Sequence, residues 1–176
     1  MAAAGIGSSA LAQARYPDRP VRLIVPAPPG SSPDAMGRIL STKLSEMWGQ
    51  AVVIDNIVGA GGIIGHDRGA KAKPDGYTLL MGLIGPMAVS SSLGGKMPFD
   101  PRADLTPITL LITLPNLLVV HPSVPVKNLA ELMEYARKNP GKLRYGYPGP
   151  GTSSHLSSEL FNDMAGLKIV GVPYKA

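Results

Sequence analysis

Apolar residues in the first third of the chain form a short continuous run and then a stretch of helical spacing. The run from Val21 to Val25 holds the β-branched and aliphatic residues typical of a buried parallel strand. From Ser32 to Gly49 the apolar residues recur at helical intervals, which predicts an amphipathic helix. We expect Ser32 to be the N-cap, with Pro33 in the first helical position, and Gly49 to end the helix.

The turn between this strand and this helix is the first candidate for chemistry. It contains Pro28-Pro29-Gly30 and opens directly onto a helix N-terminus. Backbone N–H groups at such a terminus have no partner within the helix, and the helix dipole adds partial positive charge, so the turn attracts an anion. An ordinary βα turn without a ligand is the alternative for this stretch taken alone.

Two more strands follow, at 51–55 and 77–83, and complete the strand-helix-strand-helix-strand order of a parallel, doubly wound α/β sheet. Between them lie a glycine-rich stretch at 59–65 and a short helix that we expect to end near residue 73. The glycines fit neither the Walker loop nor the dinucleotide fingerprint. They predict a place where the backbone passes close to a neighbouring loop or ligand.

The second half of the chain repeats the strand-loop-helix theme. Residues 108–120 are apolar and interrupted at Pro115, which predicts two strand segments. Helix, strand, helix and strand are then predicted in turn over residues 126–139, 143–147, 156–164 and 168–172. The strand ending at Tyr147 runs into a second loop rich in Pro, Gly, Ser and Thr. Two such units facing each other across a cleft would hold one carboxylate from two sides.

Composition and charge narrow the class of partner. The 176 residues are 44% hydrophobic and 16% charged, which is typical of a globular protein with one medium domain or two small ones. The net charge of +5 is scattered, which argues against a nucleic-acid partner. The chain has no cysteine, hence no disulfide and no thiolate metal site. Its three histidines are too dispersed to indicate a metal site, and we expect no cofactor.

The N-terminus carries information about the compartment. Residues 1–14 are small, uncharged and weakly apolar, and Ala10-Leu11-Ala12 fits the cleavage pattern of a secretory signal. We therefore expect a signal-peptide remnant at 1–14 and a mature protein exported to the periplasm, with an unstructured Ala/Gly/Ser terminus as the alternative. No later stretch is long and apolar enough to span a bilayer, so we expect no stable membrane insertion.

A series of motifs resembles a known family. The chain has Y-P-D-R-P-V-R-L-I-V-P at 16–26, followed by the Pro-Pro-Gly turn and Asp34. The later motifs are G-Q-A-V-V-I-D-N at 49–56, G-A-G-G-I-I-G at 59–65, P-G-P-G-T-S-S-H-L at 148–156 and V-P-Y-K at 172–175. The series is similar to that of the tripartite tricarboxylate transporter substrate-binding proteins, also called Bug proteins, and covers the chain from Tyr16 onward.

This resemblance implies an α/β, type II periplasmic-binding-protein fold, with two lobes that each contain a mostly parallel, doubly wound sheet. By position, the first lobe spans 15–115 and the second spans 116–176. It also implies a receptor without enzymatic activity, which captures a small carboxylate between the lobes and delivers it to membrane permease subunits. The implied ligand-binding residues belong to the two loops and their flanks: Ala27, Pro28, Gly30, Ser31, Ser32, Asp34, Tyr147, Gly149, Gly151, Thr152 and Ser153.

Some of these positions depart from the family pattern. Ala27 replaces the usual aromatic residue, Ser31 replaces a glycine, and Tyr147 replaces a small hydroxylic residue. A tyrosine at the start of the second loop is expected to narrow the cleft or to stack on a ligand, so the identity of the acid does not carry over from a relative. Asp34 either meets a ligand amine or bonds the loop amides and favours the helix dipole.

Two alternatives to a carboxylate receptor remain at this point. Family chains continue well past V-P-Y-K, so the first alternative is a truncated fragment that exposes core surface and unpaired strand edges and binds nothing. The second is a Ser/His hydrolase built on Ser153, Ser154 and His155. The sequence has no G-x-S-x-G nucleophile elbow, and a helix N-cap accounts for these residues.

Overall fold

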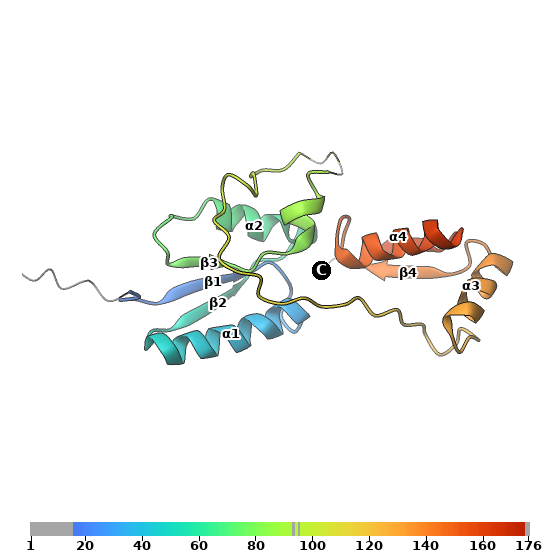
Figure 1. Ribbon diagram of the computed structural model, residues 1–176, viewed down its shortest axis with the longest axis horizontal. Helices are drawn as coiled ribbons and strands as arrows, with labels where there is room; N and C mark the ends of the chain where they lie inside the picture. Colours follow the sequence, from blue (N-terminus) through green and yellow to red (C-terminus); the bar gives the residue numbers. More distant parts are fainter. Residues whose placement is uncertain (1–15, 93, 95, 175–176) are drawn as a thin grey trace, which may run out of the picture.

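The chain forms two parallel β-sheets in a computed structural model that describes residues 16–92, 94 and 96–174 (Figure 1). The strands are β1 (Val21–Val25), β2 (Val52–Asn56), β3 (Thr78–Leu80), β4 (Arg144–Tyr147) and β5 (Val170–Pro173). The first sheet has the order β2-β1-β3, and the second pairs β4 with β5. The α/β class with parallel sheets that the sequence predicts is therefore confirmed.

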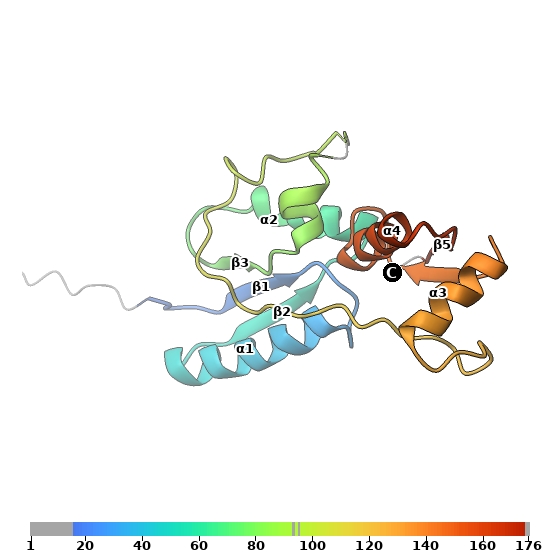
Figure 2. The ribbon, with the colours of Figure 1, turned by 45° about the vertical axis from the view of Figure 1, so that its right-hand side comes forward.

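The helices lie on both faces of the first sheet and on the second sheet. They are α1 (Ser32–Trp48), η1 (Ala60–Gly62), α2 (Ile63–Ala70), η2 (Gly85–Val89), α3 (Leu129–Lys138) and α4 (Ser153–Ala165). Helix α1 covers one face of the three-stranded sheet and α2 covers the other (Figures 1 and 2). Helix α4 packs on β4. The first sheet is thus doubly wound, as predicted.

The main core lies between β1 and α1. Val21, Leu23 and Val25 are buried on the face of β1 that α1 covers. The helix contributes Met36, Leu40, Leu44 and Trp48 to this contact. Parallel strands covered on both faces are buried throughout, which explains why β1 is a nearly continuous apolar run. Ile24, on the opposite face of β1, is fully buried as well.

The start of α1 differs from the prediction by one residue. The N-cap is Ser31, and Ser32 is already helical. Ser31 has extended backbone angles, its carbonyl accepts the N–H of Ala35 at 2.9 Å, and its hydroxyl donates to the carbonyl of Pro28 at 2.6 Å. The hydroxyl therefore closes the preceding turn and accepts no hydrogen bond from the N–H groups of the helix. Gly49 ends the helix in the left-handed conformation with φ 66°, as predicted.

The strands predicted within 108–120 are wrong. This apolar segment is an extended connection between the two sheets (Figure 1), and the described residues form no backbone–backbone hydrogen bond that involves residues 105–120. Leu110 and Leu117 are 82% and 85% exposed, and their apolar neighbours are exposed too. A strand needs a partner strand, and neither sheet offers one here. So large an exposed apolar surface is typical of a contact site for another polypeptide segment.

Candidate functional site

Loops from both sheets meet where the strands of the first sheet end. Because β1, β2 and β3 are parallel, the segments that follow them leave the same edge of the sheet. These are the first loop (residues 26–31), the glycine-rich turn (57–62) and the segment 81–84. The second loop (148–152) joins β4 to α4. Small ligands bind at such edges in α/β proteins.

The second loop contacts the edge of the first sheet at Gly61 and Gly85. A Cβ atom placed on Gly149 would lie 3.4 Å from the Cα of Gly61, and one placed on Gly61 would lie 3.4 Å from the carbonyl oxygen of Pro150. A Cβ atom placed on Gly85 would lie 3.0 Å from the carbonyl oxygen of Gly151. The prediction that the glycine-rich stretch lets the backbone pass close to a neighbouring loop is therefore confirmed.

Asp34 holds the first loop in shape. Its carboxylate is 2% exposed and accepts hydrogen bonds from the N–H of Gly30 at 2.8 Å and from the side chain of Asn56 at 3.0 Å. Arg38, one turn further along α1, donates two more at 2.9 and 3.1 Å. Asn56 also donates to the carbonyl of Ala27. The carboxylate thus links both ends of the loop to β2, in agreement with the expectation that it bonds loop amides.

These donors also fix the protonation state of Asp34. The hydrogen bonds from Arg38, Gly30 and Asn56 stabilise the carboxylate and lower its pKa to about 2, although burial opposes the shift. A carboxyl group with a lowered pKa stabilises the fold above its unfolded pKa near 3.8, and the contribution is lost as the pH falls through about 2.

Asp34→Asn is therefore expected to lower the melting temperature by several degrees at pH 7, because the donors Gly30, Asn56 and Arg38 all lose a charged acceptor. The loss should shrink as the pH falls from about 4 to 2, where the wild-type carboxylate itself becomes protonated. Thermal melts at pH 2 to 7 measure this difference, with the exposed Asp163→Asn as the control. Equal pH profiles for wild type and the Asp34 variant would show that the carboxylate does not support the loop.

The second loop is closed by its own side chains. The Thr152 hydroxyl donates to the carbonyl of Gly149 at 2.8 Å, and the N–H of Gly151 donates to Nδ1 of His155 at 3.3 Å. The ring of Tyr147 lies on the ring of His155, with 4.4 Å between the centroids and 30° between the planes. Tyr147 thus packs against α4 through His155, a contact that the sequence did not predict.

Helices α1 and α4 each begin at one of the two loops. The described residues provide no hydrogen-bond acceptor for the backbone N–H of Ser32, Ser153 or Ser154. Ser32 and Ser153 are exposed. Such N–H groups, with the positive end of the helix dipole behind them, bind carboxylates.

The structure assembles the predicted residues as two groups, one per loop. Within the described ranges, no hydrogen bond joins the first loop to the second. The second loop instead meets Gly61 and Gly85, and Asn116 donates to the carbonyl of Ser153 at 3.3 Å and to the hydroxyl of Ser157 at 2.7 Å. Sequence reasoning did not find Gly85 or Asn116, because both belong to stretches without a recognisable motif. Gly61 was recognisable from its glycine-rich stretch.

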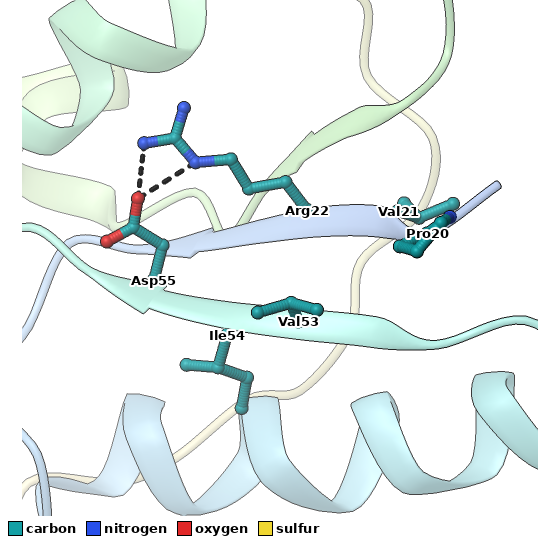
Figure 3. A pocket seen from close by; sticks show the side chains of 6 residues that line it. All are labelled: Pro20, Val21, Arg22, Val53, Ile54 and Asp55. Atoms are coloured by element: carbon teal, nitrogen blue, oxygen red, sulfur yellow. Dashed lines mark hydrogen bonds and ion pairs between the residues drawn. The ribbon is translucent and has the colours of Figure 1, made fainter.

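One surface hollow lies away from the loops. It has a volume of about 340 Å³ and is lined by Pro20, Val21, Arg22, Val53, Ile54 and Asp55. Figure 3 shows Arg22 and Asp55 paired on one face of the sheet, while Ile54 points toward α1 on the other. The hollow contains no residue of the loops, and its charges neutralise each other. We therefore place the candidate site at the loops.

The described residues do not form the hydrogen-bonded Ser/His pair that the hydrolase alternative requires. In the part of the chain that the structure describes, no hydrogen bond joins the hydroxyl of Ser153 or Ser154 to His155. Ser153 is instead 3.4 Å from Asn116, and the His155 ring accepts a backbone N–H. Residues 16–92, 94 and 96–174 hold no group of three metal-ligating side chains. Across the same residues, no helix combines the length and the apolar character of a membrane span.

The fold is that of the periplasmic binding proteins. A structure of an R. palustris protein with adipate matches 92% of this chain and 54% of its own, with a TM-score of 0.84 and 39% sequence identity. MatC from Rhodopseudomonas palustris, solved with bound malate, matches 92% of this chain and 55% of its own, with a TM-score of 0.83 and 32% identity.

Sequence comparison identifies the family within this class. The model of the tripartite tricarboxylate transporter family receptor matches residues 36–176, and the chain belongs to this family. Protein BugT of Bordetella pertussis is 39% identical over 176 residues, which cover 99% of this chain and 54% of BugT. A Pseudomonas protein from the tcbD-tcbE intergenic region is 42% identical over 160 residues, which cover 91% of this chain and 47% of that protein. The chain thus spans about half the length of these relatives.

Proposed function

We propose that this chain carries the two binding loops of an extracytoplasmic receptor for a small carboxylate, which it passes to the permease subunits of a membrane transporter. The observation that supports this most is the contact of the second loop with Gly61 and Gly85, which brings the start of α4 to the carboxyl edge of the first sheet. A carboxylate bound there would accept hydrogen bonds from unpaired N–H groups of α4 and of α1.

Two relatives support the class of ligand. The neighbouring structures hold adipate and malate, which are both dicarboxylates. We infer that one carboxylate is held by the loops of this chain through Ser32, Ser153 and Ser154, together with the hydroxyl groups nearby. The proposed site includes Ala27, Pro28, Gly30, Ser31, Tyr147, Gly149, Gly151 and Thr152 as the residues that shape the two loops. Asp34 supports the first loop from behind and does not touch the ligand in this proposal.

A second candidate is a protein that has the family fold without the binding activity. The exposed apolar segment 108–120 favours it, because an extended apolar segment without a packing partner leaves the connection between the two sheets weakly held. The two candidates differ in a simple measurement, since a ligand that binds only the folded state raises the melting temperature and a chain that binds nothing shows no response.

A thermal-shift screen against mono-, di- and tricarboxylates tests the proposed function. A ligand at 100 times its dissociation constant adds about 2.7 kcal/mol to the free energy of unfolding. For a chain of this size we expect one or more dicarboxylates to raise the melting temperature by roughly 5–10 °C. Dimethyl adipate is the control, because it keeps the carbon chain but lacks the charges. A cooperative transition that no acid moves would contradict the receptor and support the non-binding candidate.

A further inference from the structure

His66 is a fully buried histidine that joins two separate backbone segments. Its Nδ1 lies 2.8 Å from the carbonyl oxygen of Gly62, and its Nε2 accepts the N–H of Leu83 at 2.9 Å. The Phe99 ring stacks on it, with 6.1 Å between centroids and 13° between the planes. One imidazole ring thus fixes the distance between the end of the glycine-rich turn and the segment after β3.

The same two segments contact the second loop. Gly61 adjoins Gly62 and touches the loop at Pro150, and Gly85 stands two residues after Leu83 and touches it at Gly151. We call the contacts of the second loop with Gly61 and Gly85 the seat. The geometry of the seat depends on the distance between the two segments. His66 is the side chain that bonds to both of them.

The bonds of His66 require one form of the ring. Nε2 accepts an N–H, so it carries no proton, and Nδ1 must then donate to the Gly62 carbonyl. A protonated ring would turn a second N–H toward the N–H of Leu83 and break that bond. Burial lowers the pKa of His66, and the hydrogen bond to Gly62 opposes the shift only in part.

Among the described residues, no charged side chain hydrogen-bonds to the ring. Its polar partners are two backbone groups, and its stacking partner is Phe99. The nearest ionisable residues in sequence are Asp67 and Arg68 on α2 and Asp100 after Phe99, and none of them affects the pKa of His66. The Nζ atom of Lys71 lies 2.6 Å from Oδ1 of Asp67, so these two charges form an ion pair with each other.

We propose that neutral His66 is a positioning residue that sets the width of the seat, so that protonation of its ring releases the second loop from Gly61 and Gly85. This proposal concerns the contact between the two loop systems and holds whether or not the chain binds a carboxylate. Because the folded state disfavours the charged ring, the stabilising contribution is complete above the ordinary histidine pKa of about 6.5 and is lost as the pH falls below it.

NMR spectroscopy of the ¹⁵N-labelled chain between pH 7.5 and 4 tests the proposal. The chain carries His155→Gln, so that no ionisable ring other than His66 bears on the N–H of Gly151, which otherwise donates to Nδ1 of His155. We expect the His66 ring to show a protonated Nδ1 and an unprotonated Nε2 at pH 7.5. The amide signals of Leu83, Gly151 and Thr152 should then shift with one shared midpoint below pH 6.5. The proposal is overturned if Nε2 carries the proton at pH 7.5, or if Gly151 and Thr152 stay in place while His66 titrates in a folded chain.

Two variants separate positioning from simple packing. In His66→Gln the side-chain oxygen keeps an acceptor for Leu83 without a titrating ring, so the amide signal of Gly151 should lose its shift below pH 6.5. The exposed His121→Gln is the matched control and should keep that shift. A Gly151 shift that persists in His66→Gln would overturn the proposal. If His66→Gln does not fold, the titration of the His155→Gln chain that keeps His66, together with the His121 control, decides the question.

Discussion

Replacing Gly65 by alanine is expected to cost roughly 3 kcal/mol in the free energy of unfolding and to lower the melting temperature by about 6–12 °C. A Cβ atom on Gly65 would lie 2.7 Å from the carbonyl oxygen of Ile57 and 2.7 Å from Cβ of Pro26. The first atom is backbone and the second belongs to the rigid proline ring, so neither moves away without a cost in free energy. The strain therefore separates α2 from the sheet.

Gly69, one turn later on α2, supplies the matched control. A Cβ atom there would lie 2.9 Å from Cδ2 of Leu80, the far end of a flexible side chain, and 3.2 Å from Cβ of the same residue. Gly69→Ala also gains up to about 1 kcal/mol of helix propensity, so we expect its melting temperature to fall much less than that of Gly65→Ala. Urea unfolding measures both variants. Equal stability of Gly65→Ala and wild type would show that α2 does not pack as closely as described.

Replacing Gly85 by alanine is expected to weaken carboxylate binding about tenfold or more, which corresponds to about 1.4 kcal/mol. The new Cβ atom would stand 3.0 Å from the carbonyl oxygen of Gly151, so the second loop has to retreat. The N–H groups at the start of α4 move with it. Fold stability should change much less than affinity, because the added methyl group lies between the two loop systems and outside the main core.

Gly82→Ala is the control for this variant. It adds a methyl group three residues earlier, where the nearest atom is Cγ of Met87 at 3.4 Å. We expect its affinity for the preferred acid to equal that of the wild type. Calorimetric titration of both variants decides the matter, and equal affinities for Gly85→Ala and Gly82→Ala would place the ligand away from the seat.

Local patterns were sufficient for the elements that hold the loops. The apolar run of β1, the proline at the start of α1 and Gly49 at its end are all short-range signals, and the structure has each of them. The N-cap was placed one residue late because Ser31 and Ser32 are equally good caps by type. The hydroxyl bond from Ser31 to Pro28, which a sequence does not show, distinguishes them.

Non-local contacts explain the failures. Residues 108–120 have the apolar composition of strands, but a strand also requires a partner, which no local pattern supplies. The seat joins residues more than 60 positions apart, and nothing near Gly85 or Asn116 in sequence indicates the contact. His66 illustrates the same point, since its role follows from Leu83 and Phe99.

The exposed apolar segment 108–120 is also relevant to the difference in length between this chain and its relatives. The relatives are about twice as long, and their structures contain polypeptide that this chain does not match. We expect segment 108–120 to be the place where such additional polypeptide packs in the family, because its apolar side chains are exposed and its backbone forms no backbone–backbone hydrogen bond among the described residues.

The most direct test of the central claim is an NMR titration of the ¹⁵N-labelled chain with adipate and with malate. The claim predicts saturable shifts with one dissociation constant at the amides of Ser153 and Ser154, and at Ser32 at the start of α1. The amides of Gly61 and Gly85 should follow, since they contact the second loop. Well-dispersed spectra in which neither loop responds to any concentration of either acid would contradict it.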